Sequence, residues 1–282
     1  MNRLLIASVE RFGPLCDGVR ERLMTCSQTT ESFEGGALIL AAGARSQLRL
    51  LTRGLAVKDV VLPNGERQIL GVATPGDLID LSGLFAGADH GLRALGRCEV
   101  RKTSVRELKS MLEDHPRLLG ALCRAVLTEA RGQRNWMVSL GRRSAAARTA
   151  NLLCELYWRQ HTLALAKNGR CALPATQGDM ADAVGLSVVH THRVLRALHD
   201  DGLATLRNRV LHILDWERLT VLGGFEPEAL RPQRDQEDLA VLDQRAPPVL
   251  TGRSDDQGQA SRVDRGDGRA SAGPERGSSA GF

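Results

Sequence analysis

The residues of this chain whose types and spacing could do chemistry lie between Ser187 and Asp200. A helix with one buried face is predicted there by residues at i, i+3, i+4 and i+7, namely Thr191, Val194, Leu195 and Leu198. The opposite face would present Val188, Val189, His192, Arg193 and Arg196, with His190 at its edge. Arginine suits a bidentate contact with guanine, and valine can cover a thymine methyl group. This face therefore has the chemistry to read DNA bases, and Arg193 is the main candidate.

The segments on either side predict how this helix is held. Thr176, with Asp179 three residues later, is close to a capping box and begins an earlier helix. Gly185 breaks that earlier helix, and Ser187 is a good N-cap for the next one. Two short strand-like runs then surround Arg207-Asn208-Arg209. A helix, a tight turn, a helix and a hairpin in this order predict a winged helix-turn-helix.

Positive charge gathers in the same part of the chain. The net charge is +5 and the pI is about 9.1, which is compatible with an anionic partner. Between Arg131 and Arg209 few acids accompany a recurring set of arginines: Arg134, Arg142, Arg143, Arg148, Arg159, Arg170, Arg193, Arg196 and Arg207. Phosphate contacts are predicted where the entering helix and the wing would reach the DNA backbone, at Arg142, Arg143, Arg207 and Arg209.

The N-terminal part shows a different pattern. From about Ser32 to Val105, short β-like runs occur at Leu38–Leu40, Leu48–Leu51, Val57–Leu62 and Gln68–Val72. Turn residues separate them at Gly43, Gly54, Asn64-Gly65 and Pro75-Gly76-Asp77. This spacing predicts an all-β roll or barrel.

A long helix is predicted over residues 116–141, with Gly141 ending it. Its apolar residues have near-heptad spacing, at Leu119, Leu122, Val126, Ala130, Met137 and Leu140. So narrow a seam is more easily buried against an identical helix than within a globule, which predicts a homodimer. Packing of this face on the chain's own roll is the alternative.

These patterns divide the chain into four parts and predict an α+β fold. Residues 1–115 form the β-roll sensor domain, and residues 116–141 form the dimerisation helix. Residues 142–230 form the winged helix-turn-helix domain. Residues 231–282 form a largely disordered tail, since beyond Pro247 almost no apolar residue could offset the entropy of ordering.

Several classes of protein are excluded by composition. The chain has no run of eighteen apolar residues and no signal-peptide pattern at its start, so we expect a cytoplasmic protein that does not contact a membrane. The six cysteines include no C-x-x-C pair, which argues against a zinc knuckle or a disulfide framework. His190 and His192 would point about 200° apart on a helix, so they do not predict a metal site. We expect neither a resident cofactor nor enzymatic activity.

The segment from Thr176 to Leu198 resembles the helix-turn-helix of the CRP/FNR family of transcriptional regulators. The glycine turns upstream resemble that family's cyclic-nucleotide-binding-type roll, a double-stranded β-helix. Residues 141–145 and 152–156 resemble the helix that enters its DNA-binding domain, so the likeness covers about residues 30–230. The resemblance implies a regulator that binds a pseudo-palindromic operator in double-stranded DNA as a homodimer, with RNA polymerase as a candidate partner.

The resemblance also implies roles for single residues. Ser187, Arg193 and Arg196 match recognition-helix positions that contact DNA, and Thr176 matches a phosphate contact. We add Ser187 and His190 to the predicted phosphate contacts. Val188 and Val189 stand where many members carry an arginine and a glutamate that read bases. The family's usual operator is therefore not expected.

The predicted effector site departs from the family. Nucleotide-binding members hold the ribose with a glutamate and the cyclic phosphate with an Arg-Ser pair, whereas the comparable stretches here are Asp80-Leu81-Ser82-Gly83 and Asp89–Arg93. Leu81 is apolar and the Arg-Ser pair is absent, so cyclic AMP binding is not expected, although Arg93 lies nearby. Cys16 and Cys26 do not supply the closely spaced cysteines that would hold an iron cluster. The sequence does not name an effector.

Two other classes of function compete with DNA binding. A cupin-like metalloenzyme would need clustered His and Glu ligands on the roll strands, and His90 is the only histidine there. A nucleotide- or small-ligand-responsive module acting through a protein partner would not need a winged helix. The sequence therefore favours a DNA-binding regulator.

Overall fold

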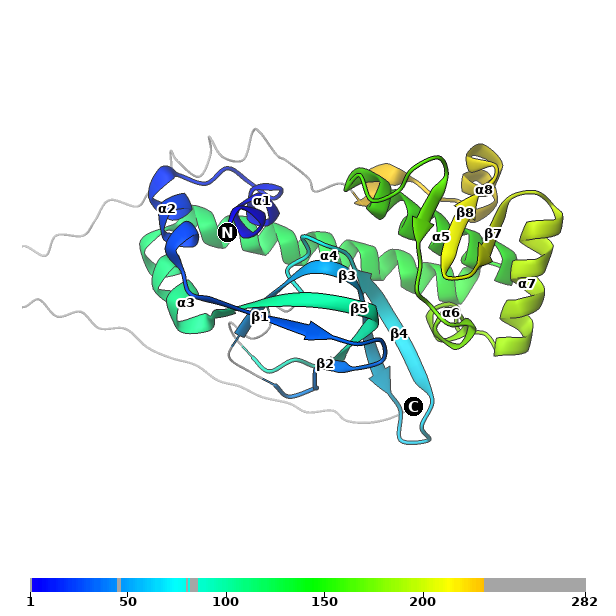
Figure 1. Cartoon of the computed structure of the whole chain (residues 1–282), viewed down its shortest axis with the longest axis horizontal. Coiled ribbons are helices and arrows are strands. Elements are labelled where there is room, and N and C mark those ends of the chain that lie inside the picture. Colours follow the sequence, from blue (N-terminus) through cyan, green and yellow to red (C-terminus); the bar gives the residue numbers. More distant parts are fainter. Residues whose placement is uncertain (1, 45–46, 80, 82–85, 231–282) are drawn as a thin grey trace, which may run out of the picture. The chain divides into compact units, whose positions relative to one another are not determined.

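The computed structural model describes residues 2–44, 47–79, 81 and 86–230 (Figure 1). Its helices are α1 (Arg3–Glu10), α2 (Asp17–Thr25), α3 (Val105–Asp114), α4 (Pro116–Arg142), α5 (Ala145–Thr162), α6 (Gln177–Val184), α7 (Val188–Asp200), α8 (Trp216–Gly223) and the 3-10 turn η2 (Pro227–Leu230). Its strands are β1 (Gln28–Phe33), β2 (Leu38–Leu40), β3 (Gln47–Val61), β4 (Arg67–Ala73), β5 (Gly91–Ser104), β6 (Arg170–Ala172), β7 (Ala204–Arg207) and β8 (Val210–Ile213). The predicted tail, residues 231–282, lies outside the described residues.

An antiparallel sheet forms the N-terminal part, in the order β1-β5-β3-β4, with β2 also paired to β5. Side chains alternate across its strands, so Leu92 and Val100 of β5 enter the roll interior and are fully buried. The predicted β-roll is confirmed. None of the helices in the described part of the chain is both long and apolar enough for a bilayer span.

Gly54 was predicted as a turn between two strands, and this prediction is wrong. The runs at Leu48–Leu51 and Val57–Leu62 belong to one strand, β3, whose pairing with β5 shifts register on both sides of Arg53. Gly54 has φ +78°, and a Cβ there would lie 2.4 Å from the carbonyl oxygen of Arg97. The glycine therefore permits a bulge and a close approach between strands, not a reversal of the chain.

The turn prediction at Gly43 agrees with the structure, where this glycine has φ +82°, and so do the two turn predictions that follow Gly54. The Gly65 amide donates to Leu62 O at 2.9 Å and the Leu62 amide to Glu66 O at 2.8 Å, which closes the β3–β4 hairpin. Gly76 has φ +89°, and the Asp77 amide donates to Thr74 O at 3.0 Å in the second turn. In each turn glycine occupies the position that needs a positive φ.

The long helix α4 has one face buried within its own chain. Leu118, Ala121, Leu122 and Ala125 pack against α1, α2 and α3, three helices that the sequence patterns did not predict. Leu122, placed in the dimer seam from its spacing, is 4 % exposed in this core and is not available to a partner. The prediction that Gly141 ends the helix is also wrong, because α4 continues through Arg142.

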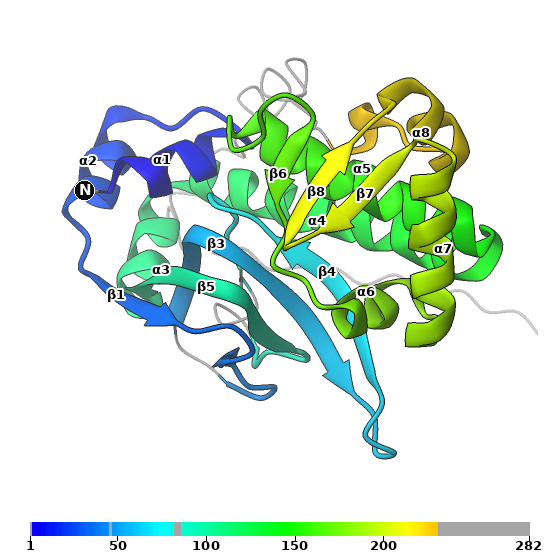
Figure 2. The same ribbon diagram turned by 45° about the vertical axis from the view of Figure 1, so that its right-hand side comes forward.

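The C-terminal part is built on a small three-stranded sheet, β6-β8-β7, with α5, α6, α7 and α8 around it (Figure 2). Its core contains the fully buried Leu173, Leu211 and Leu219. A turn at Asn168-Gly169 leads into β6, and β6 and α8 were not predicted from the sequence. The outer face of the roll sheet, including Val57 and Ile69, joins the same core. The β-roll, which is the predicted sensor domain, and the predicted DNA-binding domain therefore pack against one another.

Candidate nucleic-acid interface

Two capped helices position the predicted DNA-contacting residues. The Thr176 hydroxyl accepts from the Asp179 amide at 3.0 Å, and the Asp179 carboxylate accepts from the Thr176 amide at 2.8 Å. Gly185 ends α6 in the left-handed conformation, and the Ser187 hydroxyl then accepts from the His190 amide at 3.2 Å. The predicted capping box and second N-cap are confirmed, and they fix the turn between α6 and α7.

The helix α7 buries one face and exposes the other. Thr191, Val194 and Leu198 are buried against α5, α6 and β7, and Leu195 is half-buried. All the predicted base-reading residues are on the exposed side: Val188, Val189, His192, Arg193 and Arg196, together with His190. Arg196 lies 3.7 Å from Asp200. The side chain of Arg193 forms no hydrogen bond or ion pair with any described residue, so its guanidinium is free to contact a ligand.

The wing is a tight hairpin between β7 and β8. Asn208 and Arg209 both have positive φ, +52° and +61°, which matches the two-residue turn whose twist suits a hairpin. The side chains of Arg207 and Arg209 are exposed at its tip. The predicted wing is therefore present, with both cations turned to solvent.

We expect the two arginines of the wing to bind DNA by neutralising the charge of backbone phosphates. The double variant Arg207→Ala, Arg209→Ala should bind every DNA duplex more weakly and lower the slope of log affinity against log salt by about 0.9 per lost contact. The measurement is a titration at several salt concentrations. The double variant Arg106→Ala, Lys109→Ala removes two exposed charges from α3 and should leave the slope unchanged. Equal slopes for both variants would place the wing away from DNA.

The paired arginines at the end of α4 differ from one another. Arg142 is exposed, as a phosphate contact requires. Arg143 instead donates to Asn135 Oδ1 at 3.1 Å and to Gly224 O at 3.2 Å, and so braces α4 against the end of α8. A phosphate contact by Arg143 stays a prediction, and these two hydrogen bonds give its guanidinium a structural role.

A charge cluster missed by the sequence reasoning joins the roll to α6. Arg67 of β4 donates to Asp182 Oδ2 at 2.7 Å and to Asp179 Oδ1 at 2.5 Å. Buried Asp59 accepts from Arg93 at 3.0 Å and lies 3.8 Å from Arg67. The Asp179 carboxylate thus serves both the cap of α6 and the contact with the roll. No local pattern could reveal a pairing between residues more than a hundred positions apart.

Asp179 makes the stability of this region depend on pH. Burial alone would raise the pKa of its carboxyl, but hydrogen bonds from Thr176 and Arg67 outweigh burial and lower the pKa. A lowered folded-state pKa stabilises the protein above the ordinary aspartate value of about 3.9, and this stabilisation is lost as the pH falls through the folded-state pKa. We therefore expect the free energy of unfolding to fall less between pH 7 and pH 3 in the Asp179→Asn variant than in the wild type.

The cap itself can be measured at neutral pH. Thr176→Ala should lower the free energy of unfolding by about 1 kcal/mol in urea titrations followed by circular dichroism. Thr25→Ala removes a hydroxyl that donates within its own helix to Glu21 O at 3.1 Å, and it should change stability little. A Thr176→Ala loss no larger than that of Thr25→Ala would contradict the role of the cap.

The exposed face of α4 carries most of the predicted dimer seam. Val126 is 48 % exposed and Met137 is 72 % exposed, and Leu119 is also exposed, whereas Ala130 and Leu140 are half-buried. Leu127 and Val138 extend the same apolar stripe. The structure thus separates a buried face toward the chain's own α1–α3 from an apolar face toward solvent.

Comparison with known proteins gives these features a family. Residues 147–222 match the model of the Crp-like helix-turn-helix domain. The nitrogen fixation regulation protein FixK of Bradyrhizobium diazoefficiens is 32 % identical over 165 residues, which span 58 % of this chain and 68 % of FixK. This chain belongs to the CRP/FNR family of transcriptional regulators. As a CRP/FNR protein it is a DNA-binding regulator of transcription, with the family's roll and winged helix-turn-helix.

Other members of the CRP/FNR family extend the likeness over more of the chain. The transcriptional activator protein FnrL of Cereibacter sphaeroides is 28 % identical, over 77 % of this chain and 89 % of its own length. The solved structure of FixK2 from Bradyrhizobium japonicum superposes with a TM-score of 0.64 at 25 % identity, over 70 % of this chain and 97 % of FixK2. The roll and the DNA-binding domain are therefore both shared with other CRP/FNR proteins.

Proposed function

We propose that this regulator binds a two-fold symmetric operator as a homodimer and reads bases with the exposed face of α7. The observation that carries the proposal is Arg193, an exposed arginine without a partner among the described residues, on a helix whose opposite face is buried. Val188, Val189, His192 and Arg196 complete the base-reading surface. Thr176, Ser187, His190, Arg142, Arg207 and Arg209 would contact phosphates. Two copies present two such helices to adjacent major grooves, as a symmetric site requires.

The direct experiment selects the operator. Random duplexes are bound by the purified chain, recovered over several rounds and sequenced, and the winning site is tested by electrophoretic shift against a scrambled duplex. We expect an inverted repeat whose half-site centres lie about one helical turn, or 10–10.5 base pairs, apart. Recovery of a single, asymmetric half-site would contradict the homodimer, and no enrichment at all would contradict base reading.

We further propose that cyclic AMP does not control this protein. Leu81 is half-buried and apolar where a ribose-holding glutamate would be needed. The nearby cation, Arg93, is already paired with Asp59 at 3.0 Å and donates to Gly36 O at 3.3 Å. Asp80, Ser82 and Gly83 of the same stretch lie outside the described residues. Saturating cyclic AMP should leave operator affinity within twofold of its value without ligand, and calorimetry that showed micromolar binding would overturn this expectation.

The setting of this activity follows from its relatives. FnrL and several others are named as transcriptional activators, which supports RNA polymerase as a partner. A regulator of this kind works where the bacterial chromosome lies, so we place it in the cytoplasm and assign it no catalytic role. The competing proposal, a ligand-responsive module acting only through a protein partner, leaves the exposed face of α7 unexplained.

A further inference from the structure

The helix α6 carries two carboxylates and no basic residue, although its N-cap, Thr176, is a phosphate contact of the proposed function. Asp179 forms the capping box with Thr176, so one carboxylate lies directly at the end of the helix that would face DNA. Asp182 follows about one turn later, and its side chain is 31 % exposed. Negative groups at this place repel a backbone phosphate, so α6 alone is poorly suited to bind DNA.

The cation that compensates these carboxylates comes from the roll. Arg67 of β4 donates to Asp182 Oδ2 at 2.7 Å and to Asp179 Oδ1 at 2.5 Å, and β4 and α6 lie side by side in both ribbon views (Figures 1 and 2). No other lysine or arginine in the described part of the chain forms an ion pair with either carboxylate. Burial alone would lower the pKa of Arg67, but hydrogen bonds to Asp179 and Asp182 outweigh burial and raise it, so the guanidinium stays charged.

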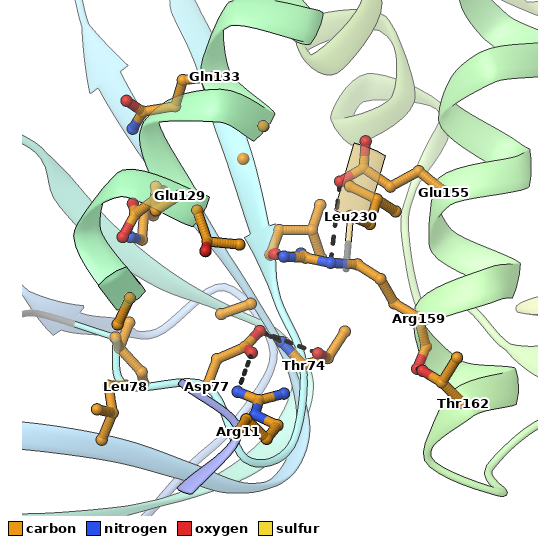
Figure 3. Close-up of a pocket in the computed structure, with 18 of the residues that line it drawn as sticks. Arg11, Thr74, Asp77, Leu78, Glu129, Gln133, Glu155, Arg159, Thr162 and Leu230 are labelled. Carbon is orange, nitrogen blue, oxygen red and sulfur yellow. Dashed lines mark hydrogen bonds and ion pairs between the residues drawn. The ribbon is translucent and has the colours of Figure 1, made fainter. Parts of the chain in front are cut away.

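The ion pairs of Arg67 are not the main contact between the roll and the DNA-binding domain. Ile69 and Val72 of β4 lie in an apolar core that they share with the C-terminal sheet. Arg159 of α5 also donates to the Val72 carbonyl, and its Nε lies 3.9 Å from Glu155 Oε1 (Figure 3). Partly exposed ion pairs contribute little to stability beside apolar burial of this kind. The two parts should therefore stay packed together when the charge of Arg67 is removed.

We propose that Arg67 is a positioning residue for DNA binding, which acts through α6 by compensating the charges of Asp179 and Asp182 and does not itself touch DNA. The inference rests on the proposed function, in which Thr176 contacts a phosphate. It makes the affinity for DNA depend on a strand of the roll, because separation of β4 from α6 would leave two uncompensated carboxylates beside that phosphate.

Asp182→Asn separates this role from that of a simple brace between the two parts. Asparagine keeps the size of the side chain and leaves the capping box of Asp179 intact, and the carbonyl of residue 182 still accepts from Gln68 Nε2 at 2.8 Å. With one carboxylate fewer and Arg67 in place, binding to any duplex should become about two- to fivefold tighter at about 50 mM salt. Loss of an ion pair that only braced the fold would weaken binding or leave it unchanged.

Arg67→Gln is the opposite change. It should weaken binding about three- to tenfold at the same salt concentration, and the loss should shrink at about 200 mM salt, because screening acts on charge. The double variant Arg67→Gln, Asp182→Asn should recover most of the loss, although the contact between β4 and α6 is then absent. Buried Asp59 keeps Arg93 as its partner at 3.0 Å in both variants, so no buried charge is left alone.

The matched control is Arg53→Gln. It removes an exposed arginine of the roll that lies 3.4 Å from Glu99 on the neighbouring strand, and it should bind DNA as the wild type does. The experiment titrates the full chain and each variant that folds by circular dichroism with the selected operator and with a scrambled duplex, at both salt concentrations. We expect equal changes on both duplexes, since a phosphate effect carries no sequence information.

Unchanged or weaker binding by Asp182→Asn would overturn the proposal. So would a loss in Arg67→Gln that does not depend on salt or that the double variant does not recover, since Arg67 would then be only a brace. Each of these results leaves operator binding by the wild type intact. Failure of the wild type and of Arg53→Gln to bind any duplex would instead contradict the proposed function, and this inference with it.

Discussion

Replacing Arg193 with alanine is expected to weaken specific operator binding roughly ten- to a hundredfold per half-site. One bidentate arginine–guanine contact contributes about 1–3 kcal/mol of discrimination. Arg193 has no internal partner among the described residues, so little of the loss would come from a disrupted fold. Lysine at this position should restore only part of the affinity, because a point charge cannot reproduce the planar guanidinium. The measurement is a titration of each variant against the selected operator and a scrambled duplex at one salt concentration.

The scrambled duplex distinguishes base reading from charge. If Arg193 contacts a base, the loss is confined to the operator, and affinity for the scrambled duplex stays close to wild type. Equal losses on both duplexes would make Arg193 a phosphate contact. Arg106→Ala, which removes an exposed arginine from α3 in the roll, should change neither affinity. Undiminished operator binding by Arg193→Ala would show that α7 does not read bases.

A glutamate at Val126 should convert the proposed dimer to monomers. In a two-fold seam along α4, residue 126 would lie close to its own counterpart, so Val126→Glu brings two carboxylates together in an apolar, poorly solvated place. Each monomer would then bind one half-site on its own, and the gain of about 10²–10⁴ in affinity that comes from joining two binding sites would be lost. Sedimentation equilibrium should show a species of 30.6 kDa in place of twice that mass.

The matched control is Val221→Glu on α8. Val221 is 82 % exposed, more than the 48 % of Val126, and lies outside the α4 stripe, so the same substitution there should leave the dimer intact. A Val126→Glu protein that still sediments as a full dimer would place the seam on another surface. Monomers from both variants would point to a general loss of folding.

Features set by neighbouring residues could be predicted from the sequence. The capping box of Thr176 and Asp179, the left-handed Gly185 and the N-cap Ser187 each depend on contacts within four residues. The faces of α7 followed from helical periodicity alone, because the helix packs on one side only. The β-roll and the winged helix were predictable for the same reason, since their strands and turns have strong local signals.

Features that depend on distant partners could not be predicted. Gly54 has the appearance of a turn in the sequence, and only its partner strand β5 makes it a bulge. The spacing of Leu122 fits the dimer seam as well as that of Val126 does, but α1, α2 and α3 cover Leu122. The heptad pattern of α4 gives no sign of those three helices. The contact of Arg67 with α6 likewise exists only because the roll and the C-terminal core pack together.

The hairpin turn of the wing also bears on how this protein can change over evolutionary time. Arg209 holds a left-handed backbone conformation, φ +61°, that costs a residue with a side chain of order 1 kcal/mol and costs glycine almost nothing. Selection for thermal resistance alone would therefore favour Arg209→Gly, and the variant would melt later while lacking one of its two wing cations. Under the proposed function, an arginine at a site that suits glycine gives up folding stability in exchange for a charge that can contact a DNA phosphate.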